Sequence, residues 1–353
     1  MHDLRTLAPE EIRRLRAAHP EMRERDFARL HKISEAQLMA AFVGEGVVRL
    51  RPDVKTFLEQ ADTLGEVMSL TRNDSAVHEK IGPFENARYN PHASIVLGDQ
   101  IDLRIFPAKW HSAFAVERTD KAGEVKRSIQ FFDPAGDAVL KLHLRPASNL
   151  AAYADLVIAL RENEQSQSVA PLPVDDSEVR ADAPVASPAE LRAAWAELTD
   201  THQFFPMLRR LNLSRHQAVT TIAEDYAWPL DLGATQAMFE GAKGTGLPLM
   251  VFIGNRGCIQ IHSDPIERVE MMGPWLNVID ETFHMHLRLD HITEVWAVRK
   301  PTKDGHVTSI EAFGADNKLI VQFFGQRQEG TDERAAWRSL VEALPRADRS
   351  NAA

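Results

Sequence analysis

The sequence contains the same pattern twice. Short segments of the first half recur in the second half in the same order, and the distance between matching residues drifts only from 179 to 182 positions. The matching segments are Pro9–Ile12 and Pro188–Leu191, Ile33–Gln37 and Leu213–Gln217, Met68–Asn73 and Met250–Asn255, Phe114–Val116 and Trp296–Val298, and Phe132 and Phe313. Ordered matches at a nearly constant distance are typical of a tandem duplication. We therefore expect two copies of one structural unit.

A segment of unusual composition separates the two copies. Between Glu162 and Glu190 the sequence has no aromatic residue, is rich in acidic residues and serine, and contains four prolines. Such a composition cannot bury a hydrophobic core and is typical of a linker. We therefore expect a first repeat at residues 1–162, a linker at 163–187 and a second repeat at 188–353.

Each copy is expected to begin with helices and to continue with strands. Ser34 and Ser214 each begin an S-x-x-Q capping box, and Ser187 precedes Pro188 at the first position of a helix. The expected strands are short runs rich in Val, Ile and Phe: Ser94–Leu97, Gln100–Phe106, Ala113–Arg118, Lys126–Phe132, Ala138–Leu144, Leu247–Ile253, Cys258–His262, Leu276–Ile279, Thr282–Leu287, Thr293–Arg299, Val307–Phe313 and Leu319–Phe324. Strands and helices do not alternate along these regions. The pattern therefore predicts an α+β class in which each half has a large antiparallel sheet.

Composition limits the possible functions. The 353 residues include 41 Lys and Arg against 51 Asp and Glu, and the net charge of −10 argues against general nucleic-acid binding. Cys258 is the single cysteine, which excludes a disulfide framework and a multi-cysteine metal cluster. The N-terminal segment lacks the apolar core of a signal peptide, and Leu150–Leu160 and Leu247–Ile253 are interrupted or too short to span a bilayer. We expect a cytoplasmic protein that does not insert into membranes.

The spacing of His284 and His286 first suggests a metal site. Residues i and i+2 of a strand face the same side, so the two imidazoles could bind one ion, with His291 nearby. The alternative is that these histidines face solvent or a groove of the sheet, since no cysteine or paired acidic residue lies nearby in sequence. The residues themselves leave both interpretations open.

Two other positions are candidates for ligand binding. The repeat places Arg104 opposite His286, and Arg104 alternates with apolar neighbours, so it faces either solvent or a polar or anionic ligand. Asp200 is expected to cap a helix that begins near His202, which is followed by two phenylalanines. A neutral imidazole beside aromatic rings suits an axial ligand of a flat apolar cofactor, and a capping histidine is the alternative. No Ser–His–Asp, Cys–His or paired-carboxylate pattern stands out, so no residue is assigned a catalytic role.

With these residues in view, the sequence resembles the bacterial HemS, ChuS and HmuS family of hemin-degrading factors, which are cytoplasmic heme-utilisation proteins. The resemblance covers nearly the whole chain. The segments that carry it are Arg72–Asn73, Val77–Lys80, Ile101–Phe106, Leu198–Phe205, Val251–Cys258, Met272–Val278, Val298–Pro301 and Phe323–Arg327. The resemblance implies a structural repeat of two α+β halves with a heme cleft between them.

The resemblance also assigns residues to heme b, iron protoporphyrin IX. It implies that His202 is the proximal ligand and binds the metal. It implies that Arg104 lies on the distal side, where its guanidinium would hold water, oxygen or peroxide by hydrogen bonds. The remaining implied contacts are Arg215, Lys300, Gln322 and Arg327 for the propionates or the cleft wall, and Phe106, Met250 and Phe252 for the apolar lining.

Two positions qualify this assignment. Phe324 stands where relatives can have tyrosine, so a hydroxyl contact would be lost there. Pro206 falls inside the helix if the helix begins at Asp200, because proline removes a backbone hydrogen bond. The helix is then either kinked at Pro206 or begins later and leaves His202 in a loop.

The function implied by the resemblance is oxidative degradation of heme with release of iron. The electrons would come from an external donor such as a reductase, since no flavin or nicotinamide site is visible in the sequence. The alternative is a carrier or store that delivers heme to a separate heme oxygenase. A third hypothesis is an interaction module that binds no heme. The partners expected under the first two are heme, a heme ABC importer, a reductase and a heme oxygenase.

Overall fold

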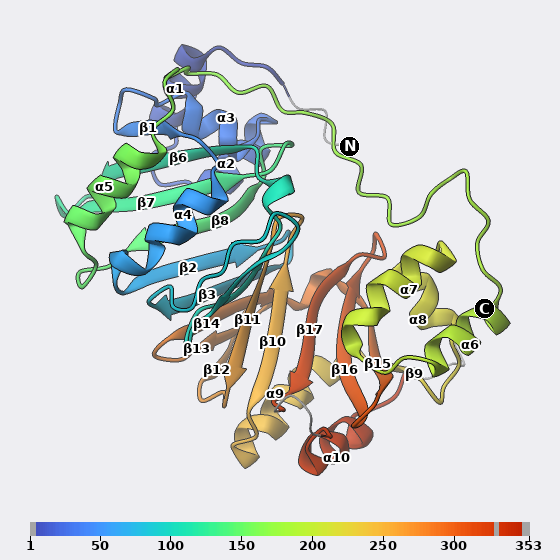
Figure 1. Ribbon diagram of the computed structural model, residues 1–353. Coiled ribbons are helices and arrows are strands. Elements are labelled where there is room, and N and C mark those ends of the chain that lie inside the picture. The colour runs from blue at the N-terminus through green and yellow to red at the C-terminus, as the bar shows by residue number, and fades with distance from the viewer. Residues whose placement is uncertain (1–4, 328–331, 348–353) are drawn as a thin grey trace. The chain divides into compact units, whose positions relative to one another are not determined.

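The computed structural model describes residues 5–327 and 332–347 (Figure 1). The chain forms two compact units. Within the described residues, the first unit comprises 5–72, 78–174 and 254–260, and the second comprises 73–77, 175–253, 261–327 and 332–347.

The described part of the first unit contains five α-helices together with antiparallel strands. The helices are α1 (Pro9–Ala18), α2 (Glu24–His31), α3 (Glu35–Ala40), α4 (Val54–Gln60) and α5 (Leu150–Leu160), with 3-10 turns η1 (Ala61–Leu64) and η2 (Pro107–Lys109). The strands are β1 (Val47–Leu50), β2 (Val67–Arg72), β3 (Ala76–Gly82), β4 (Ser94–Leu97), β5 (Asp102–Ile105), β6 (Ser112–Thr119), β7 (Val125–Phe132) and β8 (Ala138–Leu144).

The second unit is built in the same way. Its described helices are α6 (Pro188–Ala196), α7 (Phe204–Leu211), α8 (Arg215–Thr221), α9 (Ala234–Thr245) and α10 (Ala335–Ala343), with 3-10 turns η3 (Thr201–Gln203) and η4 (Leu289–His291). Its strands are β9 (Ala227–Leu230), β10 (Leu249–Gly254), β12 (Val269–Met272), β13 (Trp275–Ile279), β14 (Phe283–Arg288), β15 (Ile292–Thr302), β16 (Gly305–Gly314) and β17 (Leu319–Gly325). The strand β11 (Cys258–Asp264) has residues in both units, as do β3 and β10.

The two units have the same order of strands. In the first unit the hydrogen-bonded order is β1-β6-β7-β8-β2, and in the second it is β9-β15-β16-β17-β10. Adding 180 to the bounds of β1 gives those of β9, and adding 182 to those of β2 gives those of β10. Adding 182 to the bounds of the antiparallel pair β4–β5 gives 276–279 and 284–287, which lie within the antiparallel pair β13–β14. The predicted repeat of an α+β unit is therefore present in the structure, with two large antiparallel sheets.

Helices cover both faces of each of these strand sets. In the first unit α1–α3 contribute to one hydrophobic cluster and α4 and α5 to another. In the second unit α6–α8 pack with Val298 in one cluster, while α9 and α10 pack with Ile310, Val321 and Phe323 in the other. Because side chains of a strand alternate between faces, the two clusters lie on opposite faces of the same strands. The site described below lies on the face that carries α7 and α8.

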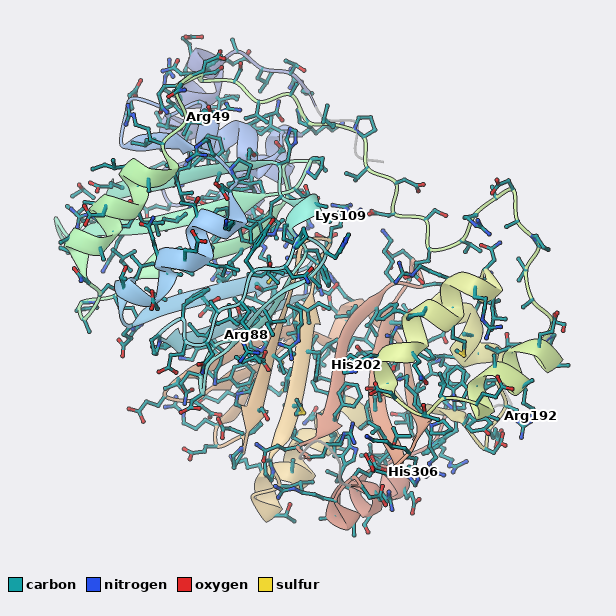
Figure 2. The ribbon with its side chains drawn as sticks, in the orientation of Figure 1. Arg49, Arg88, Lys109, Arg192, His202 and His306 are labelled. Atoms are coloured by element: carbon teal, nitrogen blue, oxygen red, sulfur yellow. The ribbon has the colours of Figure 1, made fainter. Side chains whose placement is uncertain are left out.

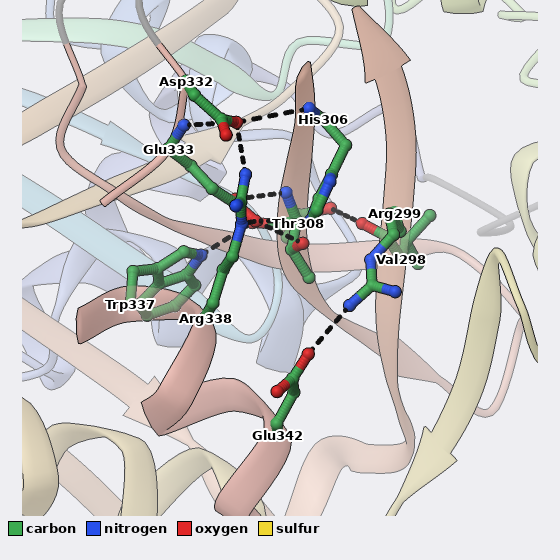
Figure 3. Close-up of polar contacts among 10 residues, drawn as sticks. Val298, Arg299, His306, Thr308, Asp332, Glu333, Trp337, Arg338 and Glu342 are labelled. Atoms are coloured by element: carbon green, nitrogen blue, oxygen red, sulfur yellow. Dashed lines mark hydrogen bonds and ion pairs between the residues drawn. The ribbon is translucent and has the colours of Figure 1, made fainter. Parts of the chain in front are cut away.

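A buried acid fixes α10 to β16 in the second unit (Figure 3). The carboxylate of Glu333 accepts hydrogen bonds from the backbone N–H of Thr308 at 2.6 Å, from its hydroxyl at 2.8 Å and from Nε of Arg338 at 3.0 Å. Nε1 of Trp337 donates to the carbonyl of Thr308 at 2.9 Å. These contacts satisfy polar groups that would otherwise be buried without a partner.

The local helix signals of the sequence are confirmed. The hydroxyls of Ser34, Ser187 and Ser214 each accept a hydrogen bond from the backbone N–H three residues later, and each belongs to a capping box. All the predicted strands are present, and Ser94–Leu97 and Ala138–Leu144 have the predicted bounds. The strands β1, β2, β3, β9 and β12 were not predicted. Of the helices within residues 5–327 and 332–347, none is both long enough and apolar enough to cross a membrane.

Candidate functional site

His202 projects from a short capped turn in the second unit (Figure 2). Asp200 caps η3, as predicted: its Oδ1 accepts the backbone N–H of His202 at 2.7 Å and lies 2.7 Å from Nδ1 of the same residue. Gln203 completes the capping box by accepting the backbone N–H of Asp200. The side chain of His202 is 94% exposed. A neutral imidazole that donates from Nδ1 to this carboxylate carries its lone pair on Nε2, which faces solvent and can bind a ligand.

Pro206 does not break the helix that follows. The turn η3 ends at Gln203 and α7 begins at Phe204, so Pro206 is the third residue of α7. The backbone N–H groups of a first helical turn have no partner within the helix, and the missing N–H of proline therefore costs no hydrogen bond there. The helix begins later than Asp200, and His202 lies in a hydrogen-bonded 3-10 turn and not in an irregular loop.

Arg327 contributes positive charge near this turn. The hydrogen bond from the backbone N–H of His202 is the main cause that lowers the pKa of Asp200, and the charge of Arg327 acts in the same direction. Asp200 therefore remains ionised near neutral pH and can keep accepting hydrogen bonds from His202. Arg327 was implied by the resemblance as a contact of the propionates or the cleft wall.

A buried charge cluster lies on the same face of the second unit's sheet. The carboxylate of Glu311 is fully buried and accepts hydrogen bonds from Arg215 at 2.8 Å, from Lys300 at 2.8 Å and from Gln322 at 2.9 Å. The hydroxyl of Ser309 also donates to it at 2.9 Å. Burial acts to raise the pKa of Glu311, but the charges of Arg215 and Lys300 hold that pKa well below its ordinary value. The structure thus brings together three residues for which the resemblance implied contacts with one ligand, Arg215, Lys300 and Gln322.

Aromatic rings next to His202 cover this cluster. The guanidinium carbon of Arg215 lies 5.1 Å from the ring centroid of Phe204 and 4.8 Å from that of Phe205. Nζ of Lys300 lies 4.7 Å from the ring centroid of Phe204. At these distances the faces of the rings attract both cations. The rings therefore connect the turn that carries His202 to the cluster around Glu311.

The adjoining strands present a half-buried apolar surface. In the register of β10 and β17, Met250 lies opposite Phe324 and Phe252 opposite Gln322. The four side chains alternate with buried residues and so share one face, and the rings of Phe252 and Phe324 are 5.0 Å apart. Across β16, Glu311 pairs with Gln322 and Ser309 with Phe324, so this surface continues into the charge cluster. A combination of apolar lining and a few polar groups is typical of a small-molecule site, and the neighbouring cations suit acidic groups on the ligand.

Arg104 and Phe106 belong to the first unit. In β5, Leu103 and Ile105 are buried while Asp102 and Arg104 are half-buried, which confirms the predicted alternation. Arg104 forms an ion pair with Asp102, and burial raises the pKa of Asp102 against the opposing charge of Arg104. The half-buried Phe106 precedes η2 and its backbone N–H donates to the carbonyl of Gly257 at 3.0 Å. That Arg104 and Phe106 lie beside a ligand bound by His202 stays a prediction.

The other candidate histidines form polar contacts within the second unit. Nδ1 of His286 lies 2.6 Å from Oδ1 of Asn277, and Nδ1 of His291 lies 3.0 Å from the hydroxyl of Ser75. Among the residues that the structure describes, no group of three or more His, Cys, Asp or Glu is placed to hold a metal ion. Cys258 is buried, and burial raises the pKa of its thiol to about 12, so it is a weak nucleophile.

Two features of the site were missed in the sequence. Glu311, which organises the charge cluster, was not identified, although its position between Ile310 and Ala312 is a signal, because an acid flanked by apolar residues in a strand faces away from them. Asp200 was identified only as a cap, whereas it also lies within hydrogen-bond distance of the imidazole of His202. Its spacing of two residues from His202 permits both contacts.

Comparison with known proteins gives close matches over nearly the whole chain. A sequence model of the haemin-degrading HemS.ChuX domain matches residues 32–160 and 212–344. The hemin transport protein HmuS of Yersinia pestis is 39% identical over 332 residues, which cover 93% of this chain and 94% of HmuS.

Two solved structures also match. Holo-PhuS, a heme-binding protein from Pseudomonas aeruginosa, has a TM-score of 0.90 at 40% identity and covers 97% of this chain and 100% of that chain. ChuS, described as a heme oxygenase of E. coli, has a TM-score of 0.85 at 37% identity and covers 93% of this chain and 98% of that chain. The sequence match and the structural match therefore point to the same group of proteins.

Proposed function

Because the chain belongs to the haemin-degrading HemS.ChuX family, we propose that it binds heme b as its substrate or cargo and ligates the iron through His202. The observation that carries the proposal is the exposed imidazole of His202, whose Nδ1 lies 2.7 Å from Oδ1 of Asp200. A carboxylate behind a histidine fixes the tautomer and raises the basicity of the nitrogen that binds metal. The relatives support the proposal, since PhuS is described as a heme-binding protein and HmuS as a hemin transport protein.

The other residues of this face suit the rest of the ligand. Met250, Phe252 and Phe324 offer apolar contacts to the macrocycle. Arg215, Lys300 and Arg327 offer cations to the two propionates, and Gln322 adds an amide. Heme carries two carboxylates on an otherwise apolar disc, so a site for it needs this separation of apolar surface and cations.

We propose that Arg104 and Phe106 act on the distal side of the iron. An arginine cannot ligate iron, because it stays protonated and has no lone pair to give. Its role would be to hold a small distal molecule, water or oxygen, by hydrogen bonds. Phe106 would add to the apolar lining of that side.

We further propose that the chain degrades heme oxidatively and so releases iron in the cytoplasm. ChuS, described as a heme oxygenase, favours this activity. The electrons would come from an external donor such as a reductase, and a heme importer would supply the substrate. The competing function is a carrier that passes heme to a separate oxygenase, and the description of HmuS as a transport protein favours it.

One experiment tests binding and then separates the two functions. Hemin is added to the purified apo-protein and the Soret band is recorded, after which an electron donor is supplied in the presence of catalase. A shifted Soret band that then bleaches to a linear tetrapyrrole supports the enzyme. A shifted band that stays stable supports the carrier, and no shift at all refutes heme binding.

Two histidine variants locate the ligand. His202→Ala is expected to weaken or rearrange the ligation of the iron, whereas His286→Ala, the matched control, should leave the spectrum nearly unchanged. The two residues are in the same unit, but His286 is half-buried and hydrogen-bonded to Asn277. The reverse result would refute the role of His202 and return attention to the His284–His286 pair.

A further inference from the structure

The buried cluster around Glu311 contains more positive than negative charge. Two cations, Arg215 and Lys300, share the single carboxylate of Glu311, and their side chains are only 6% and 4% exposed. A further acid, Glu178, is exposed and accepts the backbone N–H of Arg215, at the start of α8. An exposed carboxylate is screened by water and compensates a buried charge only weakly. One positive charge of the cluster is therefore left without a buried counter-ion.

The cations keep donors that Glu311 does not use. Arginine has five N–H donors, and within the described part of the chain the side chain of Arg215 has one hydrogen-bond acceptor, Glu311. Lysine has three N–H donors, and Nζ of Lys300 donates to Glu311 and, at 3.2 Å, to Ser309. The donors that remain can bind one more carboxylate.

The first unit shows that the fold accepts a neutral residue in place of Glu311. Subtracting 181 from 311 gives Gln130, which lies on β7 opposite Lys141, just as Glu311 lies on β16 opposite Gln322. In that unit the acids come from helices: Lys141 pairs with Glu35 of α3 at 2.8 Å and with Glu24 of α2 at 3.0 Å. The second unit differs because its acid, Glu311, belongs to a strand of the sheet, where it contacts both cations.

We propose that Glu311 determines the net charge of the ligand site in the second unit. It compensates one of the two buried cations and leaves one positive charge to pair with one propionate of heme. The inference rests on the proposed heme binding and adds a role for a residue that would not itself touch heme. Glu311 is a positioning residue. It holds Arg215, Lys300 and Gln322, which come from three different elements, and it fixes how strongly the site prefers an anionic ligand.

The test compares hemin with hemin dimethyl ester, whose propionates carry no charge. The measured quantity is the dissociation constant of the ester divided by that of hemin, for the full chain in one solvent. This ratio cancels a general loss of folding, which weakens both ligands equally. Lys300→Met removes the surplus charge, so its ratio is expected to fall about tenfold below that of the unaltered protein, the effect of about one charge-assisted hydrogen bond. Glu311→Gln adds a second uncompensated cation, so its ratio should rise.

Two further variants complete the test. The double variant Glu311→Gln/Lys300→Met again has one uncompensated cation and should return to the original ratio, and it provides the measurement if Glu311→Gln alone does not fold. Glu35→Gln removes a buried acid from the first unit and should leave the ratio unchanged. The inference is overturned if the ratio of Glu311→Gln, or that of the double variant, falls below the ratio of the unaltered protein, as the ratio of Lys300→Met is expected to do. If the unaltered protein binds neither ligand, the proposed function itself fails.

Discussion

Replacing Asp200 with asparagine should weaken heme binding and leave the fold intact. Oδ1 of Asp200 accepts the backbone N–H of His202 and lies 2.7 Å from its Nδ1. Asparagine caps helices about as well as aspartate and keeps an acceptor oxygen, so that only the negative charge is lost. The exchange therefore separates the effect of the carboxylate on the imidazole from its effect on the turn.

The size of the effect follows from the exposure of the pair. The side chains of Asp200 and His202 are 53% and 94% exposed, so their contact adds little to the stability of the ligand-free protein. A carboxylate behind a metal-ligating histidine contributes about 10- to 100-fold to metal affinity. This range corresponds to about 1.4–2.8 kcal/mol of binding free energy. Asp200→Ala should show the same loss of affinity and lose about 1 kcal/mol of stability as well, because it also removes the cap.

The assay is a hemin titration followed by the Soret band, with the Tm of each ligand-free variant as the measure of folding. The expected order of affinity is the unaltered protein first, then Asp200→Asn, then His202→Ala. If Asp200→Asn binds hemin within twofold of the unaltered protein while His202→Ala loses the band, the carboxylate does not act through the imidazole. The reasoning from the 2.7 Å contact would then be wrong.

Three further predictions concern groups outside the site. Although burial acts to raise the pKa of Glu24, the charge of Lys141 holds it at about 2 instead of 4.5. Glu24 therefore contributes stability above pH 4.5 that is lost as the pH falls toward 2, and urea unfolding at several pH values should show a flatter acid limb for Glu24→Gln. Glu333→Ala leaves the buried N–H and hydroxyl of Thr308 without their acceptor, and denaturant unfolding should show a loss of about 2–5 kcal/mol; a loss under 1 kcal/mol would contradict this. The thiol of Cys258, buried and with its pKa raised to about 12, should react with an aromatic disulfide at pH 8 only after unfolding, and fast labelling of the native protein would refute its burial.

The helices and strands that were predicted from the sequence are those determined by residues close together in the chain. Capping boxes act over three residues, and the strands found in advance are runs of apolar residues between turns. The strand β3 was missed because it places His78 and Lys80 in buried positions, where an apolar pattern would be expected. The strand β9 was missed because it contains Pro229, which usually argues against a strand. In both cases tertiary packing overrides the local preference.

The same distinction holds for the site. The contact between Asp200 and His202 spans two residues, and the turn that makes it was predicted from spacing. The contact between Arg215 and Glu311 spans 96 residues, and no local pattern brings these two side chains together. Their meeting depends on the packing of α8 against β16, which only the folded chain shows. The resemblance named the cations of this cluster but not the acid that holds them.

The exposure of His202 has a consequence for kinetics. Since the side chain of His202 is 94% exposed, in its proposed role no part of the second unit would have to open before the iron of heme reached Nε2. The association rate would then be limited by diffusion and orientation, and the affinity would be determined mainly by the dissociation rate. In the proposed role, one exposed imidazole ring would then serve both for the binding of heme and for its release.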